Sequence, residues 1–130
     1  MTVDRIVDGD TIEVTGGPFT NERVRLIGYD TPEFDPPECY AQEATDELDR
    51  LLVERRVWLT FDAECIDPFD RTLAYGHIGY PQPGFVNWHM LRQGFATTLS
   101  IAPNNTFAAD FTSAQDAAQA EGLGIWTACN

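Results

Sequence analysis

The chain has 130 residues, of which 43% are hydrophobic and 12% aromatic, and its formal net charge is −13 at pH 7. This composition is typical of one folded domain with a single core and excludes a disordered chain. No apolar run approaches the roughly 20 residues that a membrane-spanning helix requires. We therefore expect one domain over residues 1–130 and no membrane contact.

The charge comes from 21 acidic residues against eight basic ones, all of which are arginine. Nucleic-acid-binding proteins are normally basic, because neutralisation of phosphates dominates their affinity. Two interpretations of the acidic excess stay open: it keeps the protein soluble, notably in salt, or it serves a basic partner or several bound cations. In either case, long-range attraction to nucleic acid should be weak or repulsive at low salt.

The first part of the chain predicts three antiparallel strands in succession. Residues 2–7 and 11–15 have strand patterns, and the turn between them is Asp8-Gly9-Asp10. Gly16-Gly17-Pro18 closes the hairpin and leads into a third strand over residues 23–29. Such a meander places Asp10 at one end of the sheet.

The end of the third strand carries the residues with the clearest chemistry. The run from Val24 to Tyr29 is typical of a buried strand with one arginine, Arg25, and Pro32 stops strand pairing soon after it. Two carboxylates, Asp30 and Glu33, follow on a short turn. Carboxylates bind hard cations such as calcium, and arginine binds phosphate through two hydrogen bonds. A hard metal and a phosphate in one place suggest phosphodiester chemistry.

The middle of the chain predicts a helix followed by two strands. Residues 40–55 have the apolar spacing of an amphipathic helix, with the stripe Ala44, Leu48, Leu51 and Leu52. Strands are expected over residues 56–63, with Val57, Leu59 and Phe61 pointing inward, and over residues 71–80.

The last third of the chain predicts two helices and a tail that packs on the core. A short helix over residues 86–93 ends at Gly94. Residues 103–106 are expected to cap a final helix, whose buried stripe is Phe107, Phe111, Ala114 and Ala118. The tail over residues 122–126 should fold back onto the core.

Five strands with a helix between the third and fourth, and two more helices, predict an α+β fold that is mainly β. We expect a small five-stranded OB-type barrel with three helices. This architecture commonly binds oligonucleotides and oligosaccharides, although a fold alone does not determine function.

Seven motifs in this order resemble those of the staphylococcal nuclease (thermonuclease) family. They extend over nearly the whole chain: Val7-Asp8-Gly9-Asp10-Thr11, Val24-Arg25-Leu26 through Asp30-Thr31-Pro32-Glu33, Asp70-Arg71-Thr72-Leu73-Ala74-Tyr75, Val86-Asn87, Arg92-Gln93-Gly94-Phe95-Ala96, Pro103-Asn104-Asn105-Thr106 and Gly124-Ile125-Trp126. Each motif alone is weak evidence, whereas the ordered set is specific.

The resemblance implies a metal site and a general base. Asp10 and Asp30 would be calcium ligands together with the carbonyl oxygen of Thr31, and Glu33 would activate or orient the attacking water. The chemistry agrees independently: calcium binds oxygen ligands at about 2.3–2.6 Å and keeps some of its waters. A carboxylate within hydrogen-bonding reach of a water acts as a general base.

The resemblance also implies how the substrate is held. Arg25 and Arg71 would bind the scissile phosphate, and the products would have 3′-phosphate ends. Negative charge gathers on a phosphodiester as water attacks, so a cation and two guanidiniums directed at it lower the barrier. Phe69 would keep an aromatic ring for stacking on a base. Two tyrosines that border the nucleotide pocket in the family are Leu99 and Ile101 here, so weaker substrate affinity is expected.

Each of these residues also has a structural interpretation. Asp10 could be a turn residue, Arg25 a paired structural charge, and Arg71 the partner of Asp70 in a local ion pair. The structural interpretations do not explain why the whole set occurs at these spacings, so the active-site interpretation is favoured.

Three cysteines, Cys39, Cys65 and Cys129, match none of the common zinc-binding spacings. They allow one disulfide with one odd thiol, or three free thiols. In the fold implied by the resemblance, Cys39 and Cys65 both flank the active site, which predicts a disulfide between them, with two reduced thiols as the alternative. A disulfide implies an extracytoplasmic location. No basic-then-apolar signal peptide opens the chain, so we expect that any export signal has been removed or never existed.

The sequence thus predicts a secreted, monomeric, calcium-dependent nuclease that hydrolyses DNA, with RNA as a potential second substrate and no protein partner indicated. One alternative is a non-catalytic OB-type module that binds single strands or a protein. Another is a calcium-binding structural domain. The combination of Arg25, Arg71 and Glu33 favours the nuclease, because binding alone needs no such set.

Overall fold

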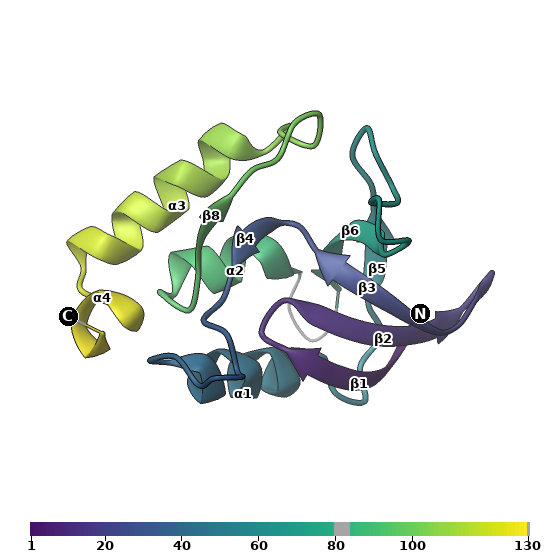
Figure 1. Ribbon diagram of the computed structural model, residues 1–130, viewed down its shortest axis with the longest axis horizontal. Helices are drawn as coiled ribbons and strands as arrows, with labels where there is room; N and C mark the ends of the chain where they lie inside the picture. The colour runs from purple at the N-terminus through teal and green to yellow at the C-terminus, as the bar shows by residue number, and fades with distance from the viewer. Residues whose placement is uncertain (80–83, 130) are drawn as a thin grey trace.

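The computed structural model describes residues 1–79 and 84–129 and has a mixed, mainly β architecture. Its elements are β1 (Thr2–Asp8), β2 (Thr11–Gly16), β3 (Phe19–Leu26), β4 (Gly28–Asp30), α1 (Ala41–Leu52), β5 (Trp58–Thr60), β6 (Thr72–Ile78), β7 (Gly84–Phe85), α2 (Val86–Arg92), β8 (Thr97–Leu99), α3 (Ala108–Ala120) and α4 (Ile125–Ala128). In Figure 1 the larger sheet lies to the right, α3 and α4 lie to the left with α2 between them and the sheet, and α1 lies at the bottom, to the left of β1.

The larger sheet has the strand order β1-β2-β3-β6-β5, and β7 also pairs with β6. The predicted meander is confirmed, because β1, β2 and β3 pair antiparallel in succession. β3 and β6 pair parallel, with Val24 opposite Thr72. Backbone hydrogen bonds between Met1 and Val57 link the two ends of the strand order. The result is the expected OB-like arrangement.

The predicted strand from Val24 to Tyr29 is divided into two strands in the structure. β3 ends at Leu26, and β4 pairs with β8 in a separate two-stranded sheet. Gly28 makes the break, since its φ of +88° is unfavourable for other residues. A Cβ atom at Gly28 would also lie 2.2 Å from Cε2 of Phe111 on α3. The division depends on this contact across the fold, which the local pattern does not reveal.

The helix predicted over residues 40–55 is confirmed as α1, and its apolar stripe is buried. The strand predicted over residues 56–63 is shorter in the structure, because only β5 pairs. Val57 is buried as expected, whereas Phe61 is exposed. Tyr80, the expected last residue of the next strand, lies outside the described residues.

The segment expected to cap the last helix has a different role. Phe107 precedes α3, and no side chain forms a cap there. The side chain of Asn104 instead bonds the backbone N–H and carbonyl of Glu64, at 2.8 Å each. Thr106 donates its hydroxyl to Asp62 at 2.9 Å. These bonds fasten the loop between β5 and β6 to the loop between β8 and α3.

The Asp62 carboxylate, at the contact between these two loops, is expected to make the free energy of unfolding depend on pH. Burial works to raise the pKa of Asp62, but hydrogen bonds from Tyr75, Ala63 and Thr106 outweigh it and hold the pKa below its ordinary value. The stabilisation is therefore complete above the unfolded pKa of about 4 and is lost as the pH falls below it. Asp62→Asn should lower the urea midpoint at pH 7, and the difference from wild type should narrow below pH 4.

The matched control for this experiment is Asp49→Asn, which removes an exposed carboxylate on α1. Its urea midpoint should follow that of the wild type at every pH. A constant difference between Asp62→Asn and wild type across the pH range would show that the carboxylate charge is not what stabilises the junction.

The tail folds back onto the core as predicted, and this return determines the disulfide. The N–H of Ile125 bonds the carbonyl of Gly94 at 2.9 Å. The return brings Cys129 beside Cys39, and the two form a disulfide with a Cα–Cα distance of 5.7 Å. The predicted Cys39–Cys65 pairing is wrong, because Cys65 is a free, exposed cysteine.

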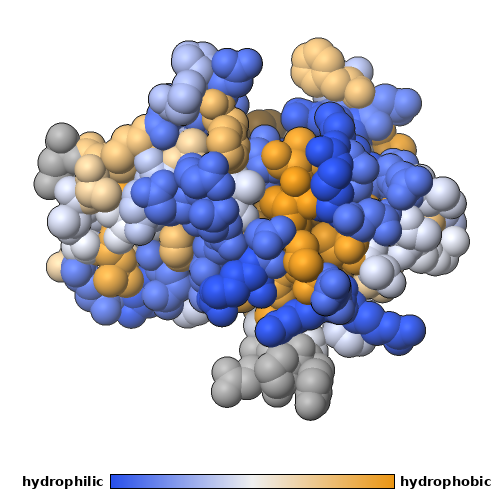
Figure 2. Space-filling view, turned by 90° about the horizontal axis from the view of Figure 1, so that it is seen from below, coloured by the Kyte–Doolittle hydropathy of each residue, from blue (hydrophilic) through white to orange (hydrophobic). Residues whose placement is uncertain are grey.

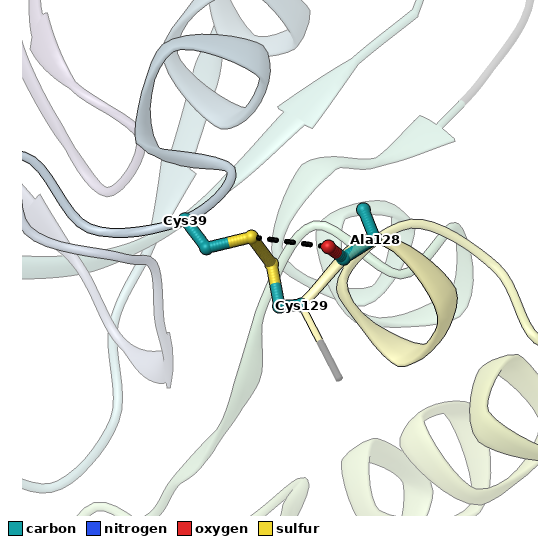
Figure 3. The surroundings of a disulfide bond; sticks show 3 residues. All are labelled: Cys39, Ala128 and Cys129. Atoms are coloured by element: carbon teal, nitrogen blue, oxygen red, sulfur yellow. Dashed lines mark hydrogen bonds between the residues drawn. A yellow bond between two sulfur atoms is a disulfide. The ribbon is translucent and has the colours of Figure 1, made fainter.

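Figure 3 shows how the disulfide joins two distant segments of the chain. Cys39 lies just before α1, and Cys129 follows α4. Cys39 Sγ also lies 3.5 Å from the carbonyl oxygen of Ala128. The bond therefore fastens the end of the chain to the loop that follows β4.

On the face drawn in Figure 2, hydrophilic residues surround a band of hydrophobic ones. This agrees with a composition rich in acidic side chains. Within the described residues, no helix has the length and apolar character needed to cross a membrane.

Candidate active site

One cleft of about 480 Å³ gathers most of the predicted site residues. Its walls come from the β1–β2 turn, β3, β4 and the segment after it, the β5–β6 loop, and the β8–α3 loop. The predicted residues that line it are Asp10, Arg25, Asp30, Glu33, Phe69 and Arg71. Thr31 lies just behind this wall and lines a neighbouring depression.

The β1–β2 turn packs closely against the end of β4. Asp10 and Thr31 are both buried, and the N–H and hydroxyl of Thr31 each lie 3.3 Å from Oδ2 of Asp10. The hydroxyl of Thr11 donates to the other carboxylate oxygen at 3.1 Å. Gly9 allows this approach, since a Cβ atom there would lie 2.6 Å from Oγ1 of Thr31. The Asp-Gly-Asp turn therefore presents Asp10 in a fixed orientation.

Asp8 also lines the cleft, and the sequence analysis gave it no role. Burial raises the pKa of Asp8 to about 6, and the hydrogen bond and negative charge of Asp10 act in the same direction. Its Oδ1 accepts the backbone N–H of Asp10 at 3.1 Å. The sequence feature that could have identified Asp8 is its position two residues before Asp10. This edge of the cleft concentrates negative charge.

The donor atoms at this edge are those that a hard cation prefers. Carboxylate oxygens are available from Asp10 and Asp30, which line the cleft, and a carbonyl oxygen would come from Thr31 behind it; none of the three is a soft ligand. In the described part of the chain, no three His, Cys, Asp or Glu side chains form a ready-made metal site. Two carboxylates and a carbonyl would leave further positions for water or substrate oxygens, which hard cations retain in such sites. The residues therefore fit a divalent cation.

Arg25 lies between the two candidate metal ligands. Its Nη2 is 3.3 Å from Oδ2 of Asp10 and 3.6 Å from Oδ1 of Asp30. The guanidinium also donates to the carbonyl oxygens of Leu26 and, at 2.9 Å, of Tyr29. Only 12% of the side chain is exposed. Arg25 thus bridges the break between β3 and β4 and neutralises both carboxylates.

Glu33 is exposed at the mouth of the cleft, and its backbone is held by a neighbouring residue. Oε1 of Glu38 accepts the N–H of Glu33 at 2.6 Å, and the N–H of Glu38 donates to the carbonyl of Glu33 at 2.9 Å. Cys39, which follows, is anchored by the disulfide. The turn is fixed through its backbone, so the Glu33 carboxylate is left to face the cleft.

Arg71 lies on the opposite wall and pairs with Asp67 rather than with Asp70. Its Nε donates to Oδ2 of Asp67 at 2.6 Å. The guanidinium carbon lies 5.9 Å from the ring centroid of Phe69, whose side chain is 81% exposed. Arg71 and Phe69 therefore project together from the β5–β6 loop toward the cleft.

An apolar rim extends from Phe69 across the cleft. Leu99 and Ile101 line it from the far side, and Ile101 is 65% exposed. Exposed aliphatic side chains beside an aromatic ring provide a surface for the face of a base but no hydrogen bonds to its edge. Sequence reasoning missed two further acids of the same cleft, Glu64 and Asp67. Nothing local distinguishes Glu64 from other loop acids.

Comparison with known proteins identifies the family of the chain. The sequence model described as "Staphylococcal nuclease homologue" matches residues 23–128. The chain is 36% identical to the thermonuclease of Staphylococcus intermedius and 33% identical to that of Staphylococcus hyicus. These matches cover 95% and 96% of this chain, and 74% of each relative.

A further relative is the SPbeta prophage-derived endonuclease YokF of Bacillus subtilis (strain 168), which is 31% identical over 98% of this chain and 44% of its own length. All three relatives are named as nucleases. They support a nuclease function, with nucleic acid as the substrate. From the family match, the identities and the fold, the chain belongs to the staphylococcal nuclease family.

Proposed function

We propose that the chain is a calcium-dependent nuclease that hydrolyses phosphodiester bonds in DNA, and potentially in RNA, and leaves 3′-phosphate ends. One observation carries the proposal: Arg25, Arg71, Glu33 and the carboxylates Asp10 and Asp30 all line one cleft. Two cationic groups, a general base and a cation site are what phosphodiester hydrolysis requires.

The two arginines would hold the scissile phosphate from opposite sides of the cleft. Guanidiniums bind phosphate oxygens through paired hydrogen bonds and stabilise the charge that grows during attack. Arg25 neutralises Asp10 and Asp30 in the structure. Its guanidinium would be freed for phosphate once those carboxylates are neutralised in another way.

Glu33 would accept the proton of the attacking water. Its carboxylate is exposed at the cleft mouth, on a turn fixed by Glu38. A bound Ca²⁺ on Asp10, Asp30 and the carbonyl of Thr31 would supply positive charge next to the phosphate. Phe69 would stack on a base and thereby place the strand across the cleft.

The test is a cleavage assay on DNA and RNA with and without a chelator, followed by re-addition of Ca²⁺ or Mg²⁺. Cleavage should stop with the chelator and return with Ca²⁺. The products should block extension by a polymerase until a phosphatase has removed their 3′-phosphates. Cleavage that continues undiminished in chelator would overturn the metal dependence.

The same assay separates the alternatives. Binding to nucleic acid without cleavage and without a metal requirement would favour a non-catalytic OB-type module. Calcium uptake without any binding of nucleic acid would favour a calcium-binding structural domain. The set of Arg25, Arg71 and Glu33 favours the nuclease over both, because neither binding of nucleic acid alone nor binding of calcium alone needs this set.

Salt should affect this enzyme less than most nucleases. Added salt normally weakens nucleic-acid binding, because the release of counterions from the nucleic acid becomes less favourable as the salt concentration rises. Here a net charge of −13 repels the substrate, and salt screens that repulsion. Activity between low and molar NaCl is therefore expected to show a shallow dependence or an optimum at elevated salt. A steep, monotonic loss of activity would contradict this prediction.

We also propose that the protein acts as a monomer outside the cytoplasm. The Cys39–Cys129 disulfide supports this location, because disulfides persist mainly in oxidising compartments. Thiol titration of the natively isolated protein, before and after denaturation, would test it. One free thiol is expected, and three would contradict an oxidising location.

A further inference from the structure

Asp67 lies on the β5–β6 loop and forms an ion pair with Arg71, a residue of the candidate active site. Its side chain is 10% exposed, whereas that of its partner Arg71 is 45% exposed. Charged carboxylates are rarely buried unless they are paired. The two partners therefore differ in exposure. The Asp67 side chain is largely covered, whereas the Arg71 side chain extends from the loop toward the cleft.

The two carboxylate oxygens of Asp67 have different partners. Oδ1 accepts the backbone N–H groups of Phe69 at 2.9 Å and of Arg71 at 2.8 Å. Oδ2 accepts Nε of Arg71 at 2.6 Å. The backbone N–H of Asp67 also donates to the carbonyl of Arg71 at 3.0 Å. One oxygen thus organises the turn, and the other holds the guanidinium.

The contact at Nε determines which edge of the guanidinium remains for a substrate. Arginine binds phosphate best through two parallel N–H donors. A single oxygen at Nε leaves the edge formed by Nη1 and Nη2 available. Arg25 differs, because its Nη atoms are engaged by Asp10, Asp30 and two backbone carbonyls.

We propose that Asp67 is a positioning residue that holds Arg71 by Nε, so that the Nη1–Nη2 edge meets the scissile phosphate in the transition state. The proposal rests on the proposed nuclease function. It predicts that the Asp67 carboxylate affects kcat more than KM, because the phosphate gains negative charge only as attack proceeds. Burial tends to raise the pKa of Asp67, but hydrogen bonds from Arg71 and Phe69 hold it below its ordinary value, so the carboxylate is charged at neutral pH.

The test compares Asp67→Asn with Asp70→Asn. The asparagine at 67 keeps an oxygen for the two backbone N–H groups but removes the anionic partner of Nε. Asp70→Asn removes the same charge from the same loop, and asparagine tolerates the φ of +67° at that position. We expect Asp67→Asn to lower kcat about tenfold and to change KM less than threefold, with Asp70→Asn close to wild type.

A double-mutant cycle with Arg71→Gln separates positioning from stability. If Asp67 acts through Arg71, Asp67→Asn should lower kcat less than twofold in the Arg71→Gln background. A loss caused by a damaged fold would persist in full there and would overturn the proposal. Equal kcat values for Asp67→Asn and Asp70→Asn would also overturn it.

Three further outcomes have different meanings. A rise in kcat in Asp67→Asn would show that Asp67 competes with phosphate for Arg71, and would overturn the positioning role. If the wild-type chain cleaves no nucleic acid under any metal condition, the proposed function itself fails and the role of Asp67 falls with it. If the wild type cleaves nucleic acid and Asp67→Asn has the same kcat as Asp70→Asn, only the inference about Asp67 is wrong.

Discussion

Glu33→Gln is expected to lower kcat by about 10²- to 10⁴-fold and to leave KM nearly unchanged, because an amide cannot accept the proton of the attacking water. The free energy of unfolding should stay within about 0.5 kcal/mol of wild type, since the side chain is exposed and the bonds to Glu38 come from the Glu33 backbone. Steady-state cleavage with saturating Ca²⁺ measures kcat and KM, and urea unfolding measures the free energy of unfolding.

The matched control is Asp35→Asn, which removes an exposed carboxylate two residues further along the same turn, away from the cleft. Its kcat should remain near the wild-type value. If Glu33→Gln retains full activity, another group acts as the base. If both variants lose activity equally, the effect belongs to the charge of the loop rather than to Glu33.

Loss of the Cys39–Cys129 disulfide is expected to lower the free energy of unfolding by about 4–5 kcal/mol. The two cysteines are 90 residues apart, and in the chain-entropy model a cross-link over such a length strongly restricts the unfolded chain. Urea unfolding of Cys129→Ser should show this loss. Reduction of the wild-type protein with dithiothreitol should move its midpoint to that of the variant.

Cys65→Ser is the control, because Cys65 is free and exposed. Its unfolding should match that of the oxidised wild type, and it should still respond to the reductant. If dithiothreitol leaves the wild-type midpoint unchanged, the bridge does not stabilise the fold. If Cys65→Ser lowers the midpoint as Cys129→Ser does, the pairing of the cysteines differs from that described here.

Local patterns predicted much of the fold. Alternation and turn residues defined the meander of β1, β2 and β3, and helical spacing defined α1. These features are decided by residues close in sequence, so the sequence reveals them. The ordered motifs also indicated a cleft with Asp10, Arg25 and Arg71 around it, and these residues do line one cleft.

Features decided by distant contacts were missed. The break at Gly28 depends on the ring of Phe111, more than 80 residues later. Asn104 bonds Glu64 rather than a helix end, because the two loops meet only in the folded chain. The partner of Cys39 depends on the return of the tail, and no spacing rule could choose Cys129 over Cys65.

Two of the three acids that were missed, Asp8 and Asp67, share one property that the exposed Glu64 lacks. Asp8 and Asp67 are acids whose importance comes from burial next to charged partners. Burial of a loop carboxylate cannot be read from its neighbours in sequence. A turn acid four residues before an arginine, such as Asp67 before Arg71, is a pattern that could have drawn attention to one of them.

The division at Gly28 has a consequence for how the protein loses activity. Asp10 and Arg25 belong to the barrel, whereas Asp30 and Glu33 lie on or after β4, which forms a separate two-stranded sheet with the three-residue strand β8. Short pairings open locally at lower free energy than a whole core. Opening of this small sheet would separate the two halves of the site while the barrel stays folded. Inactivation by denaturant would then precede unfolding of the barrel and would be reversible.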